Sequence, residues 1–437
     1  MPVSVRSLGM DLDLKKDAAK ATLMFGLLIL PIVIRLPTAA LGGKLTLLEP
    51  VTLAALCFWF WSVCLGARRV VRIPGNQIAL IVFYMGCVLS FFASPDPSVS
   101  MVALLTYVNG GLILFLMYQL IRCERDVTIA VRFLLLGSVV PLCAAVVGSA
   151  GLLVGLKIPA VVSRAGKLTA SFMFSSQVPS YMLILIPLLL QVASSSAHRT
   201  VVRVAASVGT ITAMCAILFS GSRSGVAAAI AVTFLYLLRR SRGTRRVLVL
   251  GLIGAVVVGL GPAQLPAEIF PRPVARSVSG MTELFRGGND LSTLSAARAE
   301  HVGLVIEGLK RSPFLGIGLG AFHLVVDDLA GRDVKDLEVH NTLLSVLVET
   351  GLVGFAGFLL FGVACLVEGM RGLWGRKRGK LRSVQQALLF GLAANFAHQQ
   401  FHFGLRQPVF WIGLGLLLAV AHVRSTDREN VALRRVA

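Results

Sequence analysis

Long apolar runs, separated by short polar or basic segments, recur along most of the chain. An α-helix needs about 20 mostly apolar residues to cross the roughly 30 Å hydrocarbon core of a bilayer. Runs of this length predict twelve transmembrane helices, and an even number places both termini on one side of the membrane. Their approximate spans are 19–36, 46–67, 77–93, 101–121, 127–153, 178–195, 201–220, 223–239, 247–261, 342–369, 383–400 and 406–423.

The positions of Lys and Arg give an independent test of this topology, because loops that stay in the cytoplasm keep an excess of them. With the N-terminus inside, the inner segments hold more than half of the 42 Lys and Arg residues. We expect the first run to be retained as a helix and not cleaved as a signal peptide, because a polar leader containing Asp precedes it. The sequence therefore predicts an all-α polytopic integral membrane protein with both termini in the cytoplasm.

Composition supports the same class. Of the 437 residues 56% are hydrophobic and only 14% are charged, whereas soluble domains carry about 25% charged residues. The net charge of +21 does not require a nucleic-acid partner, because basic cytoplasmic loops produce it. The seven Cys residues lie in or beside apolar runs without a CxxC pair, which predicts neither a disulfide framework nor a zinc site.

Two outer segments, 156–177 and 262–341, are longer than the other loops and hold most of the outer charges. The second divides the chain into helices 1–9 (1–261), a long outer loop (262–341), and helices 10–12 with a cytoplasmic tail (342–437). We expect function in these outer segments, since the lipid-facing helices offer little chemistry.

Within the long loop, residues 292–311 predict an amphipathic helix that lies at the membrane surface or over a cavity mouth. Ser295 is the expected cap, and Arg298 lies on the polar side. The apolar stripe at helical spacing consists of Val302, Val305, Ile306 and Leu309.

The segment FSGSRSG at 219–225 places Arg223 at the outer end of a helix, next to Ser222 and between two glycines. A guanidinium donates two parallel hydrogen bonds to phosphate oxygens, so this turn suits a phosphate or diphosphate. The alternative is an interfacial Arg that extends to lipid headgroups.

Other polar residues of the outer segments also have two interpretations. Arg298, Arg164 and Lys167 either bind an anionic substrate or are solvated or paired surface charges. His340, at the membrane boundary, suits a general base that Glu338 could orient. In the alternative interpretation, Asn341 beside it simply caps the following helix.

No metal or cofactor is expected. His398 and His402 have the spacing of a zinc pair, but no Glu lies between them and no third ligand is evident. The glycines at 316, 318 and 320 follow a predicted helix and not a strand, which indicates a tight turn and not a nucleotide-binding loop.

Several motifs follow one another in a fixed order: SGSRSG at 220–225, AAR at 296–298, SP at 312–313 with GxGxG at 316–320, HN at 340–341 and ExGLxG at 349–354. This order, its spacing and its sidedness resemble the O-antigen ligase family, inner-membrane proteins of Gram-negative bacteria with Wzy-type polymerases as relatives. The resemblance covers about residues 160–420. It departs from the family at 175–177, which read Ser-Ser-Gln where relatives often have an Asn-containing stretch.

The resemblance implies a metal-independent glycosyltransferase of GT-C-like architecture in the bacterial inner membrane, with its active site facing the periplasm. Such a ligase transfers O-antigen from undecaprenyl diphosphate to a sugar hydroxyl of the lipid A core. It implies that Arg223 and Arg298 hold the diphosphate and that His340 takes the acceptor proton in an inverting displacement. Further expected binding residues, for the diphosphate or the acceptor, are Arg164, Lys167, Ser222, Glu338 and Asn341.

Three alternatives remain at this point. A Wzy-type polymerase would use the same donor and pass it to another undecaprenyl-linked glycan. A small-anion transporter would also have twelve spans and outer arginines, but the apolar runs contain few of the intramembrane acidic residues that transport pathways use. A purely structural scaffold would leave the outer Arg and His residues without a role.

Overall fold

The computed structural model describes residues 17–31, 46–71, 77–163, 165–238, 302–331, 339, 341–371, 373, 379–402 and 404–436. In these ranges the regular structure is almost entirely helical, and β-structure is limited to isolated bridges such as the antiparallel pair Val162 and Leu168. The predicted all-α class is confirmed for this part of the chain.

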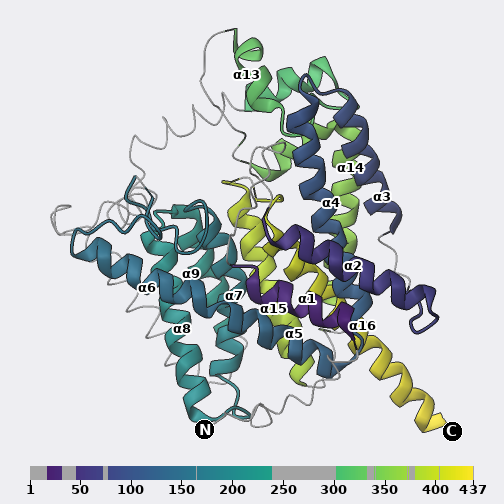
Figure 1. Ribbon diagram of the computed structural model, residues 1–437, viewed down its shortest axis with the longest axis vertical. Coiled ribbons are helices and arrows are strands. Elements are labelled where there is room, and N and C mark those ends of the chain that lie inside the picture. Colours follow the sequence, from purple (N-terminus) through teal and green to yellow (C-terminus); the bar gives the residue numbers. More distant parts are fainter. Residues whose placement is uncertain are drawn as a thin grey trace.

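The labelled helices are arranged as Figure 1 shows. Their bounds are α1 Ala18–Ile29, α2 Leu48–Cys64, α3 Gln77–Phe92, α4 Pro97–Leu120, α5 Glu124–Gly137, α6 Val139–Leu153, α7 Gln177–Ala193, α8 Thr200–Phe219, α9 Arg223–Leu238, α13 Phe322–Ala330, α14 Thr342–Met370, α15 Lys380–Gln399 and α16 Pro408–Val436. A helix occupies each predicted span that falls within the described residues, and the span 247–261 lies outside them. Twelve crossings and their orientation stay predictions.

Three details of the helices were not part of the expectation. The predicted span 127–153 lies within one apolar stretch, Glu124–Leu153, that is long enough to cross a membrane, and within it Ser138 separates α5 from α6 and donates its hydroxyl to the carbonyl of Leu135 at 2.6 Å. The last helix continues past residue 423 to Val436. Inside α14 the backbone is interrupted at Gly351, whose φ of 62° is accessible mainly to glycine.

The helices pack in two groups, one that contains α3, α4 and α14 and one that contains α7, α8, α9 and α15, and α16 contacts both groups. Helix α3 packs along α14, and α7 packs against α8, α9 and α15, while α16 lies between α4 and α15 (Figure 1). Glycines allow the closest approaches: a Cβ on Gly86 of α3 would lie 2.3 Å from the Cα of Gly354 in α14. Small residues bring membrane helices into this kind of backbone contact.

Helix α15 is unusual because it is central and polar. It has 20 residues but is not among the helices apolar enough to cross a membrane by composition. Three of its amide side chains, Gln385, Asn395 and Gln399, are fully buried. They bond to protein groups: Gln385 Nε2 donates to the carbonyl of Gly369 at 2.7 Å, and Asn395 donates to that of Ser180.

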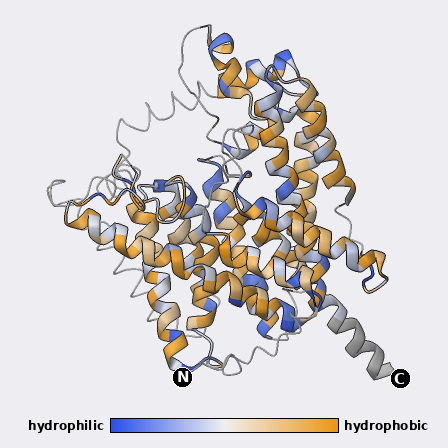
Figure 2. Ribbon diagram, in the orientation of Figure 1, coloured by the Kyte–Doolittle hydropathy of each residue, from blue (hydrophilic) through white to orange (hydrophobic). Residues whose placement is uncertain are grey.

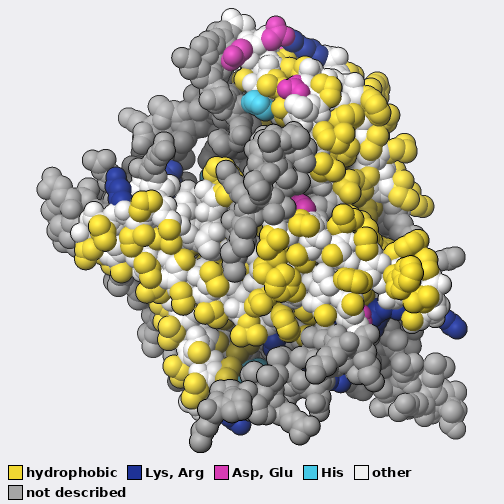
Figure 3. All heavy atoms as spheres, in the orientation of Figure 1, with side chains coloured by type: hydrophobic (Ala, Val, Ile, Leu, Met, Phe, Trp, Pro, Cys, Tyr) yellow, Lys and Arg dark blue, Asp and Glu magenta, His cyan; other side chains and the backbone are white. Residues whose placement is uncertain are grey.

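The outer surface of the helices is apolar. Large side chains point outward on several of them, with Ile78 on α3 77% exposed and Ile211 on α8 62% exposed. Figure 2 shows that hydrophobic residues dominate the helices, and Figure 3 shows hydrophobic side chains across the middle of this face, with Lys and Arg mainly toward its upper and lower ends. Side chains of this kind facing outward are typical of a multi-pass membrane protein.

Residues 302–311 form a helix that packs against α13 and α14. The predicted apolar stripe is partly wrong, because Val302 and Ile306 are exposed while Leu304 and Val305 are buried. The reason is a tertiary contact: the buried side faces Val348 of α14, where the helix has only Gly308. After it, Gly316, Gly318 and Gly320 all have positive φ, which confirms the predicted tight turn.

Candidate functional site

The turn between α8 and α9 fixes the start of α9, where Arg223 is the first residue. The buried Ser222 accepts a hydrogen bond from the Gly225 amide at 3.2 Å and so caps the helix. Gly225 lies against α7, since a Cβ there would be 2.7 Å from Cβ of Pro179. Arg223 is half-buried and forms no ion pair with any described residue. Its charge and the helix N-terminus both favour an anion at this place.

The C-terminal end of α15 contacts this turn. Ser224 Oγ and His398 Nδ1 lie 2.9 Å apart in a hydrogen bond, and His398 is buried. The ring of His402 is centred 5.0 Å from that of His398. Across the described ranges, no group of three or more His, Cys, Asp or Glu side chains is placed to hold a metal ion. His398 is therefore a helix-to-turn contact in this part of the protein.

The start of α14 bonds to the same end of α15. Asn341 caps α14 by accepting from the Leu344 amide at 3.0 Å, and its amide donates to the carbonyl of Gln400 at 3.1 Å. Thr342 Oγ1 donates to the carbonyl of Gln399 at 2.9 Å. Asn341 therefore caps α14, as one interpretation of the sequence predicted, and its second hydrogen bond connects α14 to the end of α15.

The segment 156–177 contacts the end of α8. The amide of Leu168 donates to the carbonyl of Phe219 at 3.0 Å, four residues before Arg223. Lys167 is half-buried in a tight loop, where its amide donates to Ser163 Oγ at 3.1 Å. Lys167 therefore belongs to a segment that contacts the α8–α9 turn.

Four of the predicted site residues are described: Lys167, Ser222, Arg223 and Asn341. Four others lie outside the described residues: Arg164, Arg298, Glu338 and His340. Ser224, which follows Arg223, bonds to His398 in the last turn of α15, and Asn341, which follows His340 in the chain, bonds to Gln400 directly after that helix. Two separate segments that carry predicted catalytic residues thus meet at one helix end.

Sequence reasoning missed a second polar group, here named the buried carboxylate cluster: Ser345, Glu349, Gly320 and Arg406. Glu349 Oε1 accepts from Ser345 Oγ at 2.9 Å, and Oε2 accepts from the Gly320 amide at 2.9 Å and from Arg406 Nη2 at 3.0 Å. The Glu349 side chain is 6% exposed and that of Arg406 is 32% exposed. The cluster connects α14, the glycine turn and the segment that precedes α16.

The α8–α9 turn and the start of α14 lie in a part of the chain that is similar to a known family. Residues 208–359 match the O-antigen ligase family. The match begins within α8, includes the α8–α9 turn, Arg298, His340 and Glu349, and ends within α14. No curated protein matches the chain.

The O-antigen ligase match confirms the resemblance inferred from the motifs. It supports membership of the family that contains O-antigen ligases and Wzy-type polymerases, and with it a glycosyltransferase-like enzyme. Together with the apolar helices it indicates a multi-pass membrane protein. The only signal for the carboxylate cluster was Glu349 in the ExGLxG motif, because Arg406 is 57 residues away and no sequence rule pairs them.

Proposed function

We propose that this protein is an O-antigen ligase of the bacterial inner membrane, with twelve transmembrane helices and an active site facing the periplasm. It transfers O-antigen polysaccharide from undecaprenyl diphosphate to a sugar hydroxyl of the lipid A core. The family match supports the substrate class, since lipid-linked polysaccharide and lipid A core are what the family implies.

The observation that carries the proposal is the meeting of two matched segments at the end of α15. The Ser224–His398 bond holds the α8–α9 turn, and the Asn341–Gln400 bond holds the start of α14. Arg223 and His340 are the direct chain neighbours of these two anchors. Catalysis between a bound donor and acceptor requires such groups to be held in one place.

In the proposed reaction, His340 removes the proton from the acceptor hydroxyl. The acceptor oxygen then forms a bond to the anomeric carbon as the bond from that carbon to the diphosphate oxygen breaks, with inversion. The diphosphate leaves with the electron pair, and Arg223 and Arg298 stabilise its added charge. Because diphosphate is a good leaving group, this scheme requires no metal.

The remaining predicted residues have supporting roles in the proposal. Lys167 belongs to the segment that contacts the end of α8, and we assign to Lys167 and Arg164 the binding of diphosphate or acceptor phosphates. Ser222 and Asn341 use their oxygens as helix caps, and we assign them the positioning of Arg223 and His340. Glu338 is assigned the orientation of His340.

The test uses the purified full chain in detergent with undecaprenyl-diphosphate-linked O-antigen, lipid A-core acceptor and EDTA. The gel mobility of the acceptor is followed for wild type and for Arg223→Ala, Arg298→Ala and His340→Ala. Wild type is expected to modify the acceptor, and each variant is expected to lose this activity while keeping its melting temperature. Arg311→Ala is the matched control, because Arg311 is an exposed arginine paired with Asp328.

Three results would contradict the proposal. Lengthening of the lipid-linked glycan with an unmodified acceptor would identify a Wzy-type polymerase. Activity that survives all three substitutions would remove the assigned residue roles, and an absence of both reactions would make anion transport the next function to measure.

A further inference from the structure

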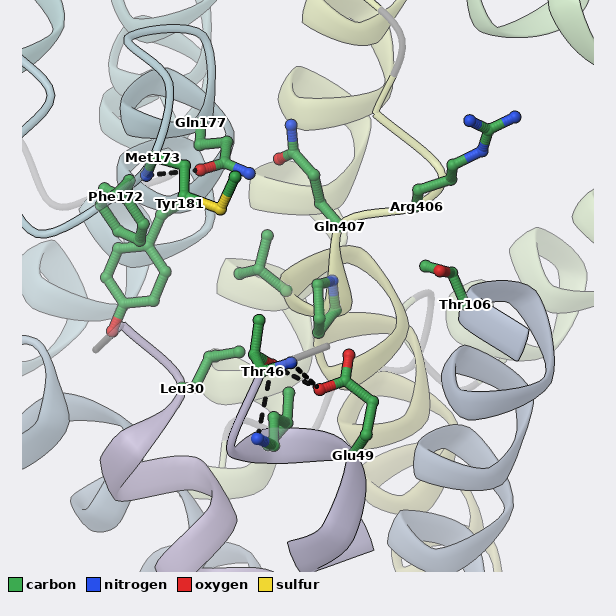
Figure 4. Close-up of a pocket in the computed structure, with 13 residues that line it drawn as sticks. Leu30, Thr46, Glu49, Thr106, Phe172, Met173, Gln177, Tyr181, Arg406 and Gln407 are labelled. Carbon is green, nitrogen blue, oxygen red and sulfur yellow. Dashed lines mark hydrogen bonds between the residues drawn. The ribbon is translucent and has the colours of Figure 1, made fainter. Parts of the chain in front are cut away.

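A cavity of about 210 Å³ lies between α1, α2, α4, α7 and the start of α16. It has polar walls made by Thr106, Gln177, Arg406 and Gln407, and an apolar wall that includes Phe172 and Tyr181 (Figure 4). Its size suits one ring of a ligand and not a polymer. None of the roles assigned above uses this cavity.

Two amide side chains face each other across the cavity, from α7 and from the segment before α16 (Figure 4). The oxygen of Gln177 accepts from the Met173 amide at 3.0 Å, so its NH₂ group remains to donate toward the cavity. Gln407 Oε1 is shielded from solvent and has no hydrogen-bond partner among the described residues. A buried acceptor of this kind costs free energy unless a ligand donates to it.

The charges around the cavity do not favour an anion. Glu49 contributes a carboxylate at the end opposite the two amides. Arg406 contributes a cation, but its Nη2 already donates to Glu349 Oε2 at 3.0 Å. The charges of Glu49, Arg406 and Glu349 do not add up to a net positive charge at the cavity. A phosphate would therefore lose its hydration here without an available counter-charge. Hydroxyl groups, in contrast, can both donate to Glu49 and Gln407 and accept from Gln177.

The apolar wall completes the match to one ligand class. The rings of Phe172 and Tyr181 are 5.3 Å apart between centroids and are tilted by 47°. A sugar ring has apolar C–H faces and hydroxyls along its edge, so its faces suit aromatic carbon and its edge suits the amides and Glu49. We propose that this cavity binds one uncharged sugar ring, which belongs either to the donor glycan or to the acceptor core.

This proposal rests on the proposed function and extends it, because the cavity adjoins the segments that carry the reaction. Gln177 follows the outer segment whose Leu168 bonds to Phe219 at the end of α8. Arg406 and Gln407 follow the turn whose carbonyls accept from Asn341 and Thr342. A sugar held in the cavity lies between the segment that bonds to the end of α8 and the segment that follows the turn bonded to the start of α14.

The experiment combines ligand binding with kinetics on the full chain in detergent. Saturation-transfer difference NMR is recorded with two free oligosaccharides, one O-antigen repeat unit and one lipid A-core oligosaccharide, neither carrying lipid or diphosphate. The variants are Gln407→Leu and Thr106→Val, and the second keeps the shape of the side chain if the first does not fold. Gln191→Leu is the control, because Gln191 is a buried glutamine near the end of α7 opposite Gln177 and does not line the cavity.

We expect wild type and Gln191→Leu to show saturation transfer to one of the two oligosaccharides. Gln407→Leu and Thr106→Val should weaken it and raise KM for the substrate that carries that sugar by about three- to tenfold with kcat nearly unchanged, since each loses an uncharged hydrogen bond. A change in KM for the lipid-linked donor identifies a donor sugar, and a change for the core identifies an acceptor sugar.

Failure of this proposal is distinct from failure of the proposed function. Normal acceptor modification by wild type without saturation transfer to either oligosaccharide overturns the cavity proposal alone. So does unchanged KM in both cavity variants. Saturation transfer that the cavity variants abolish, in a protein that modifies no acceptor, supports the sugar site and overturns the ligase.

Discussion

Two regions of this protein each contain an arginine, and they use its charge in opposite ways. In the buried carboxylate cluster, Arg406 donates to Glu349, whose two oxygens also accept from Ser345 and Gly320. At the α8–α9 turn, Arg223 is half-buried, begins a helix and forms no ion pair with any described residue.

The difference separates an arginine that holds helices together from one that is available to a ligand. An anion that approached Arg406 would compete with a carboxylate that is already in place. At Arg223 it would meet the positive end of a helix and a charge that has no ion-pair partner in the described part of the chain. The comparison predicts that substitution of Arg223 removes activity and that disruption of the Glu349 cluster removes stability.

The largest effect is expected for Arg223→Ala. Loss of one donor to the developing charge on the diphosphate should lower the rate of acceptor modification by about 10³-fold. Arg223→Lys should recover only part of it, because an ammonium lacks the two parallel donors. Gel-shift rates measure this, and the melting temperature in detergent should stay that of wild type. An active Arg223→Ala protein would remove the contrast between the two arginines.

Glu349→Gln should mainly affect stability. It keeps the side-chain shape but leaves the largely buried Arg406 without its counter-charge, which should cost about 2–3 kcal/mol after allowance for the 32% exposure of Arg406. Unfolding in a denaturing detergent titration measures the loss. The double variant Glu349→Gln/Arg406→Gln should regain much of it, and a double variant no more stable than the single one would contradict the ion-pair explanation.

A smaller effect is expected for Asn341→Ala, which removes the cap of α14 and its bond to Gln400. The two bonds together should stabilise this end of α14 by about 2 kcal/mol. Faster hydrogen exchange at the Thr342 to Ser345 amides, together with reduced activity, is the expected result. Asn341→Asp keeps the cap acceptor but not the donor to Gln400, so it separates the two contributions.

The smallest effect is expected for Ser224→Ala. It removes the bond to His398 and loosens the turn beside Arg223, so activity should fall by about tenfold or less with little change in melting temperature. Ser207→Ala is the matched control, since Ser207 is an exposed serine on α8 that bonds only to its own helix. Equal activity in the two variants would show that His398 does not position the turn.

Hydropathy and basic-residue sidedness predicted the all-α class and a helix for every predicted span that the structure describes. These properties are local, because each prediction uses only the residues of its own segment. The break at Ser138 and the extension of α16 to Val436 were not predictable in the same way. The first lies beside a close contact with α1, where a Cβ on Gly137 would lie 2.6 Å from the carbonyl of Leu28. The second depends on a charged tail that stays helical beyond the apolar run.

The candidate site was predictable only in part. The SGSRSG motif identified the α8–α9 turn, and the His-Asn pair identified the start of α14. His398 was considered only as a metal ligand, and its partner Ser224 is 174 residues away. The Glu349–Arg406 pair and the cavity also depend on contacts between distant segments, which neither spacing nor composition encodes.

The buried polar side chains of α15 have a consequence for how this protein is made. A helix with Gln385, Asn395 and Gln399 at buried positions gains little from entering lipid alone. Its amides bond to Ser180 on α7 and to Gly369 on α14, and both helices are synthesised before it. We therefore expect α15 to enter the lipid only when α7 and α14 are already beside it. The C-terminal part would then insert by cooperative assembly of several helices and not one helix at a time.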